Sequence, residues 1–415
     1  MASPRPTADR SLGWRRVSLA LGPGLVVMLA DTDAGSVITA AQSGAQWGYQ
    51  LLMLQFLIIP ILFAVQELTV RLGLATGKGL GELVLQRFGR TWAVLSMATL
   101  VVSCFGALVT QMSGLAGVGQ MFGVPIWQTI TLLVILIFAM VCTGSYHSVE
   151  RIAILLGLFE LAFLVVAWKA NPDRGEMLAE VQHVPLTDSG YLYLLAANLG
   201  TSIMPWTVFY QQSALIGKGL TIDHIRLARF DTFFGAILCQ MITAAVLIAA
   251  AATVGRHGHG VSLDSVPEIA NAFTAALGDT TGRVVFAIGL SGGALVATIV
   301  VCLTASWTIG EVTGFRHSLE HHPFEAPWFY SAFAVILVGG GVLVASGVNL
   351  VRLSIATGVI NALLLPVVLG FLYLLALNAL PDPYRLKGSY AKIIGLLFLA
   401  TAGMGLYAGI FGALA

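Results

Sequence analysis

The stretch ADTDAGSVITAAQSGAQWGY, residues 30–49, places Asp31 and Asp33 inside a strongly apolar segment of the chain. An ionised side chain near the middle of a membrane costs about 2.5–3.5 kcal/mol even on mild insertion scales, so carboxylates at that depth indicate a functional site. On a continuous helix, side chains two positions apart diverge by about 200°. A break at Ala34 and Gly35 would let both aspartates face one ligand. Because the segment holds no Lys or Arg, a bound cation is the simplest partner.

The composition predicts that the protein lies in a membrane. Of its 415 residues, 57% are hydrophobic and 10% are charged, against about 25% charged residues in soluble domains. Apolar segments of about 20 residues, long enough to cross a bilayer, recur along nearly the whole chain. The sequence therefore predicts an all-α integral protein of the cell membrane, in contact with the lipid bilayer. The formal net charge of +1 argues against a nucleic-acid partner, which needs clustered cations on a water-exposed face.

The four cysteines lie singly in apolar segments, without the paired spacing of zinc sites or disulfides. We expect them to be small buried side chains; they are Cys104, Cys142, Cys239 and Cys302.

Polar breaks divide the chain into eleven expected transmembrane helices. Short-loop cations, beginning with Arg15 and Arg16 before the first segment, predict a cytoplasmic N-terminus. We expect a cytoplasmic tail over residues 1–16, a first inverted repeat of helices 1–5 over 17–170, an extracellular connection over 171–189, a second inverted repeat of helices 6–10 over 190–378, and a loop with helix 11 over 379–415. A short amphipathic helix is expected in an outside loop, around residues 266–277.

Segments 1 and 6 share an interruption near mid-membrane. In the sixth segment, NLGTSIMPWT (residues 198–207), Gly200 and Pro205 disfavour a continuous helix. Paired interrupted helices at corresponding places in two halves are typical of transporters that bind their substrate near the midplane. A break in each segment therefore predicts a substrate site between them.

Three further residues near the interruptions are candidate ligands. Ser36, Thr201 and Met204 would supply a hydroxyl, a backbone carbonyl and a thioether. Oxygen donors suit Mg²⁺ and Mn²⁺, whereas a thioether favours softer metals. Alternatively, one aspartate caps the broken helix or pairs with a distant arginine such as Arg352, an interpretation that suits Asp31 better than Asp33.

Three stretches resemble a known family. They are GPGLVVMLADTDAGSVITAAQSGAQWGYQLL (22–52), VRLGLATGKGLGEL (70–83) and TSIMPWTVFYQQSAL (201–215), which look like helices 1, 2 and 6 of the natural resistance-associated macrophage protein (NRAMP) family of divalent-metal transporters. The resemblance implies a LeuT-type fold. It also places Asp33 at the aspartate of the family's Asp-Pro-Gly-Asn motif and Ser36 at the asparagine. In helix 6, it places Thr201 at the carbonyl-donating alanine and Met204 at the sulfur ligand of the Ala-x-x-Met-Pro-His motif.

The sequence also departs from that family. Trp206 stands at the helix-6 histidine, a second family histidine falls near Gln211, and the acidic pair on helix 3 is replaced by Thr110 and Gln111. Trp cannot change charge between pH 5 and 8 as His does. The pattern is most similar to the branch of NRAMP-related magnesium transporters, which implies Mg²⁺ or Mn²⁺ uptake without strong proton coupling.

Other polar residues in apolar segments have two interpretations each. Gln42, Gln211 and Asn361 are candidates, with Trp206, to line the cavity or its aqueous pathways, but interhelical hydrogen bonds explain them equally well. Glu67 is placed to pair with Arg71 four residues later. Glu160 has no near cation in sequence and is either a structural partner or a proton carrier.

The leading hypothesis is a monomeric transporter or facilitator for hard divalent cations. Asp33 is its principal ligand, and Asp31 adds negative field or holds waters around the ion. No cofactor and no enzymatic activity are expected. The alternatives are proton-coupled Mn²⁺ or Fe²⁺ symport, a LeuT-type symporter for an organic solute, and an intramembrane aspartyl hydrolase whose two carboxylates share a proton.

Overall fold

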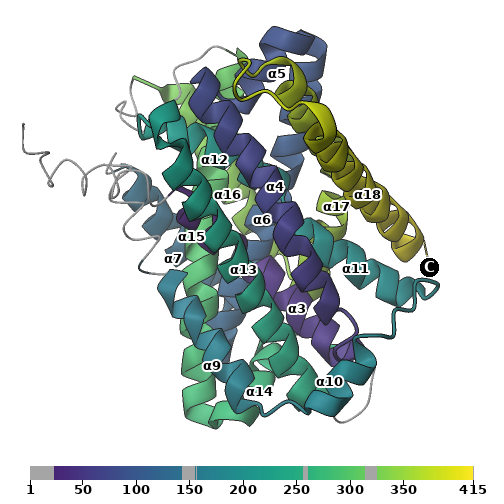
Figure 1. The fold of residues 1–415 in the computed structure, drawn as a ribbon. Helices are drawn as coiled ribbons and strands as arrows, with labels where there is room; N and C mark the ends of the chain where they lie inside the picture. Colours follow the sequence, from purple (N-terminus) through teal and green to yellow (C-terminus); the bar gives the residue numbers. More distant parts are fainter. Residues whose placement is uncertain (1–22, 143–154, 156, 256–259, 314–324, 415) are drawn as a thin grey trace, which may run out of the picture.

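The computed structural model describes residues 23–142, 155, 157–255, 260–313 and 325–414. In these residues all regular structure is helical, and the helices gather into one bundle (Figure 1). The helices are α2 (Pro23–Asp31), α3 (Ala34–Trp47), α4 (Leu52–Thr76), α5 (Leu80–Phe88), α6 (Arg90–Met121), α7 (Ile126–Cys142), α9 (Ala162–Lys169), α10 (Arg174–Glu180), α11 (Ser189–Ser202), α12 (Pro205–Gly217), α13 (Ile225–Thr253), α14 (Val266–Leu277), α15 (Asp279–Thr313), α16 (Pro327–Ala345), α17 (Leu350–Asn378) and α18 (Gly388–Ala413), with 3-10 turns at η1 (Leu158–Leu161) and η2 (Ile222–His224).

The described helices account for most of the expected membrane crossings. Eight spans are long and apolar enough to cross a bilayer, one of them formed by α11 together with α12, and α2 with α3 would form a ninth, bent by 47°. The fifth of the eleven expected segments, residues 152–170, lies partly outside the described residues, so the count of eleven stays a prediction. The amphipathic helix expected around residues 266–277 is present as α14.

The two ends of the bundle carry different elements. Helix α5 lies at one end, and α10 and α14 lie at the other (Figure 1). The C-terminal end of α3 lies at the same end of the bundle as α10, because the backbone N–H of Tyr49, just after α3, donates to Glu180 on α10 at 2.8 Å. We refer to these as the α5 end and the α10 end.

The first helix break has a local cause. Helix α2 ends at Asp31 and α3 begins at Ala34. Between them Asp33 takes an extended backbone conformation (φ −84°, ψ −178°) and caps α3. Asp is among the best N-cap residues, because its carboxylate satisfies an N–H that the new helix leaves unpaired.

The second break follows from a proline. Helix α11 ends at Ser202, and α12 begins at Pro205, with Met204 extended before it (φ −80°, ψ 136°). Proline suits the first turn of a helix and forces the preceding residue out of the helical region.

Glycine brings the neighbouring helices close to these breaks. A Cβ on Gly200 would lie 1.8 Å from the carbonyl oxygen of Gly358, so α11 and α17 are in backbone contact. The breaks are therefore held in a tightly packed interior. Of the cysteines, Cys104, Cys239 and Cys302 are buried and free, as expected, and the side chain of Cys142 lies outside the described part.

Candidate metal-binding site at the helix breaks

Asp33 lies at the centre of the site. Its Oδ1 accepts a hydrogen bond from the backbone N–H of Ser36 at 2.8 Å, and its Oδ2 accepts one from the side-chain amide of Gln111. The side chain is only 2% exposed. One aspartate thus caps the broken helix, but it is Asp33 and not Asp31. A carboxylate has about four lone-pair positions, so these two hydrogen bonds leave acceptor capacity for a cation.

The hydroxyl of Ser36 connects the two breaks. Its Oγ lies 2.7 Å from the carbonyl oxygen of Asp31 and 3.0 Å from that of Thr201. These carbonyls belong to the C-terminal ends of α2 and α11, where the helix dipole is negative. One oxygen each from Asp31, Ser36 and Thr201 therefore gather in a region that favours a cation.

Met204 lies at the second break, with its sulfur already engaged. The indole N–H of Trp206 donates to the Met204 sulfur at 3.1 Å. Both side chains are buried. A thioether is a weak hydrogen-bond acceptor. The contact therefore occupies the Met204 sulfur, which is the one soft metal ligand among the predicted ligands.

The carboxylate of Asp31 is buried and incompletely paired. It is fully shielded from solvent, its Oδ2 accepts from the Cys239 thiol at 3.5 Å, and its Oδ1 has no hydrogen-bond partner in the described structure. Arg352, considered as its partner, instead approaches Asp264 at 3.6 Å on the surface. Asp31 therefore contributes a backbone oxygen and a negative charge near the break. In the part of the chain that the structure describes, neither Asp31 nor Asp33 pairs with a Lys or Arg.

Gln111 is a site residue that the sequence analysis did not select. While its N–H donates to Asp33, its Oε1 accepts from the backbone N–H of Ala34 at 3.0 Å. One amide from α6 thus holds both the carboxylate and the first N–H of α3. The available signal was a lone amide in the apolar interior of α6, at the position where the resembling family carries acids.

The predicted pathway residues lie in other contacts. Gln42 donates to Ser262 Oγ at 3.3 Å and accepts from Leu263 N–H at 3.0 Å, which ties α3 to the loop before α14. Gln211 donates to Thr232 at 2.8 Å. Asn361 is buried on α17, and its Oδ1 has no hydrogen-bond partner among the described residues. None of the three forms a hydrogen bond to the predicted ligands.

An ion network lies between α4 and α13, toward the α5 end. Glu67 accepts from Arg71 at 2.7 Å, which confirms the expected pair, and from Arg229 Nε at 3.0 Å. Arg71 also donates to the carbonyl of Tyr384 at 3.2 Å. Gln42 lies on the α10 side of the bundle and this network on the α5 side, and both Asp31 and Asp33 are buried, so the helix breaks are closed to solvent in this structure.

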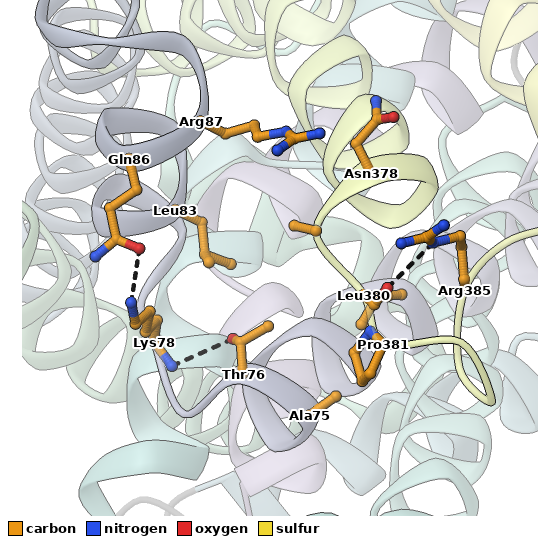
Figure 2. A pocket seen from close by; sticks show the side chains of 11 residues that line it. Ala75, Thr76, Lys78, Leu83, Gln86, Arg87, Asn378, Leu380, Pro381 and Arg385 are labelled. Atoms are coloured by element: carbon orange, nitrogen blue, oxygen red, sulfur yellow. Dashed lines mark hydrogen bonds between the residues drawn. The ribbon is translucent and has the colours of Figure 1, made fainter.

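A pocket of about 580 Å³ lies at the α5 end, between α5 and the loop after α17 (Figure 2). Lys78, Arg87 and Arg385 line it, and Figure 2 shows Lys78 bonded to Gln86. Three cations make this pocket unsuited to a metal ion. The helix breaks remain the better candidate, although no three His, Cys, Asp or Glu residues in the described ranges are grouped as a ready-made metal cage.

Comparison with known proteins assigns the family. The model of the natural resistance-associated macrophage protein-like (Nramp) family matches residues 24–410. The chain belongs to the Nramp family. Among curated relatives of this Nramp protein, the divalent metal cation transporter MntH of Verminephrobacter eiseniae is 24% identical over 399 residues, covering 92% of this chain and 85% of the relative. MntH of Deinococcus radiodurans is 28% identical over 347 residues, covering 79% and 76%.

Solved structures show the same fold for this Nramp chain. The manganese transporter of Eremococcus coleocola matches with a TM-score of 0.74 at 17% identity, covering 99% of this chain and 88% of that one. MhsT, solved with L-phenylalanine, matches with a TM-score of 0.66 at 14% identity, covering 94% and 97%. These neighbours support the LeuT-type architecture that the resemblance implies. At such identities they carry no information on substrate.

Proposed function

We propose that the protein is a multi-pass transporter that imports hard divalent cations, Mg²⁺ and also Mn²⁺, with Asp33 as principal ligand. Its N-terminus is cytoplasmic, it works as a monomer, and uptake proceeds without strong proton coupling. Membership of the Nramp family and relatives named as divalent metal cation transporters support the substrate class. Among the described residues, neither Asp31 nor Asp33 forms an ion pair with a Lys or Arg, which supports a positively charged substrate.

The observation that carries the preference for hard ions is the contact between Trp206 and Met204. Because the indole N–H occupies the sulfur at 3.1 Å, the remaining candidate ligands are the oxygens of Asp31, Asp33, Ser36 and Thr201. Their hydrogen bonds leave lone pairs for a cation. Carboxylate, hydroxyl and carbonyl oxygens suit Mg²⁺ and Mn²⁺. Mg²⁺ keeps several of its waters and is usually bound through one or two carboxylates, which fits so few protein ligands.

Two side chains support weak proton coupling. Gln111 contacts Asp33, and Trp206 contacts Met204. Neither an amide nor an indole changes charge in the physiological pH range, whereas His does. The groups that touch these two candidate ligands therefore provide no proton relay.

Proton-coupled Mn²⁺ or Fe²⁺ symport is the second candidate, and the retention of Met204 at the break favours it. Rotation of Trp206 would free the sulfur for a softer metal. A proton-sharing aspartyl hydrolase has no support in the geometry. Asp33 is bound to Gln111 and Ser36 while Asp31 faces Cys239, so the two carboxylates do not hydrogen-bond each other.

Ion fluxes in liposomes test the proposal. The purified protein is reconstituted, and Mg²⁺ and Mn²⁺ influx is recorded with internal pH under a fixed membrane potential, with empty liposomes as control. We expect Mg²⁺ influx without internal acidification. Mn²⁺ influx with acidification and without Mg²⁺ flux would replace the proposal with the second candidate, and absence of any divalent flux would contradict both.

A further inference from the structure

Glu160 is a buried carboxylate that the proposed metal site does not use. It lies on the η1 turn before α9, and it is fully shielded from solvent. The Thr32 side chain lies beside it, but the Thr32 hydroxyl donates to the Met28 carbonyl at 3.2 Å, and neither Glu160 oxygen has a partner of hydrogen-bond geometry among the described residues. An unpaired ionised carboxylate inside a membrane is costly, and such residues normally pair or bind an ion. Glu160 therefore requires a partner that the described side chains do not supply.

The carboxylate faces the first helix break. The position that a Cβ on Gly293 would take lies 2.4 Å from Glu160 Oε1 and 2.6 Å from the carbonyl oxygen of Thr32. Because one point is that close to both oxygens, they lie within about 5 Å of each other. Because Gly293, on α15, has no side chain, both oxygens can approach the backbone of α15 at this place. Glu160 and Thr32 thus point acceptor oxygens at the same small space.

Among the described residues, the carbonyl of Thr32 lacks the hydrogen bond that a continuous helix would give it. In a continuous helix it would accept from the N–H four residues later, which is Ser36. That N–H donates to Asp33 Oδ1 instead. Two acceptor oxygens with no donor between them repel each other, and a cation bound between them would satisfy both.

Among the described residues, the titratable groups around Glu160 are acidic or neutral. Asp33 on the first break and Cys239 on α13 interact with it electrostatically, and Cys239 in turn contacts Asp31. From α15 the neighbour is Gly293, which carries no charge. No described Lys or Arg pairs with Glu160. The field at Glu160 therefore attracts a cation.

We propose that Glu160 and the Thr32 carbonyl form a second cation site, beside Gly293, which takes a monovalent cation, either a proton or Na⁺. A proton on Glu160 would be donated toward Thr32, and Na⁺ would be bound between the two oxygens. The inference rests on the proposed function in one respect: Thr32 lies between Asp31 and Asp33, so the second site adjoins the divalent site. Occupancy at Glu160 removes negative charge near Asp33 and weakens divalent binding. The two cations thus oppose each other, and the monovalent ion regulates uptake without being carried along with the metal.

Carbodiimide labelling tests occupancy without relying on transport. Dicyclohexylcarbodiimide reacts with protonated carboxyl groups in apolar surroundings, and mass spectrometry locates the adduct. The full chain in liposomes is labelled between about pH 5 and 8, and at fixed pH with Na⁺ replacing choline. We expect the amount of Glu160 adduct to fall several-fold as the pH rises. A lower amount of adduct in Na⁺ than in choline at the same pH would identify Na⁺ as an occupant of the site. An adduct that is absent, or constant under both changes, would overturn the proposal.

Divalent binding tests the linkage between the sites. Mn²⁺ is titrated onto the wild-type chain with and without the monovalent ion that labelling identifies, and we expect its affinity to fall about fivefold or more with that ion. Glu160→Gln should bind Mn²⁺ at the weaker level in both conditions. Glu176→Gln, the same change on the exposed α10, should behave as wild type. An equal response to the ion in Glu160→Gln and wild type would contradict the linkage.

A second variant tests the monovalent site without replacing Glu160. Gly293→Ala places a methyl group against both oxygens, which must then move apart, and should make the Glu160 adduct insensitive to Na⁺. Should the wild type bind no Mn²⁺ at all, the proposed function fails, while the labelling result still decides whether Glu160 is a cation site.

Discussion

The side-chain amide of Gln111 holds Asp33 by donating to its carboxylate and accepting from the N–H of the next residue, Ala34. This contact joins α6 to the first helix break. It orients the carboxylate through a group that has no charge and cannot exchange a proton with it. The contact that orients the Asp33 carboxylate is therefore separate from any group that could couple metal transport to a proton.

Gln111→Leu removes both hydrogen bonds while keeping a similar volume. A hydrogen bond to a charged group contributes about 1.5–3 kcal/mol, so divalent affinity should fall roughly 10- to 100-fold. Titration of Mn²⁺ onto the purified variant measures this. Gln120→Leu, on the exposed end of the same helix, is the matched control, and equal affinities in the two variants would show that Gln111 does not position Asp33.

Trp206→Phe should change metal preference. The variant removes the N–H that occupies the Met204 sulfur, which frees a soft ligand. We expect Cd²⁺ to gain about tenfold over Mg²⁺ in competition binding, a difference of about 1.4 kcal/mol. Trp307→Phe is the control, because Trp307 stacks on Tyr210 instead. A Cd²⁺ to Mg²⁺ ratio that stays at the wild-type value would argue against the hard-ion interpretation.

Gly200→Ala should destabilise the bundle strongly. Its methyl group would lie 1.8 Å from the carbonyl oxygen of Gly358, so α11 and α17 would have to separate. Overpacking typically costs about 1–3 kcal/mol, and a backbone clash belongs at the upper end of that range. Thermal unfolding in detergent should show a much lower unfolding temperature for this variant than for the wild type. Gly217→Ala, with no atom within 4 Å of the added carbon, should unfold near the wild-type temperature; similar losses in both variants would mean that the close approach is not what matters.

Glu67→Gln should loosen the network at the α5 side. The change removes the charge that pairs with Arg71 and Arg229 and leaves the largely buried Arg71 and the half-exposed Arg229 near each other without a counter-charge. We expect water-soluble maleimide to modify the buried Cys239 several-fold faster, as read by mass spectrometry. Glu82→Gln, in an exposed pair with Lys78 at 3.6 Å, serves as control. If Cys239 reacts equally slowly in both variants, the network does not close this path.

Much of the fold followed from local chemistry in the sequence. Apolar length predicted the spans, and Pro205 lies at the start of α12, as expected for the second interruption. The first break was expected at Ala34 and Gly35, whereas α3 already begins at Ala34 because Asp33 caps it. The contacts of Asp33 did not follow in the same way. Capping by Asp33 depends on the extended backbone at one residue, and the amide of Gln111 reaches it across 78 positions of sequence. Nor could the sequence show that Trp206 turns its N–H back onto Met204. Side-chain direction at a break depends on packing between helices, which periodicity does not encode.

The central claim is that Asp33 binds the transported divalent ion. Influx of Mg²⁺ and Mn²⁺ into liposomes containing wild-type protein or Asp33→Ala measures it most directly, with equal protein incorporation and matching size-exclusion profiles required of both. The account predicts influx with the wild type and none above empty liposomes with Asp33→Ala. Influx that is unchanged in Asp33→Ala would contradict it.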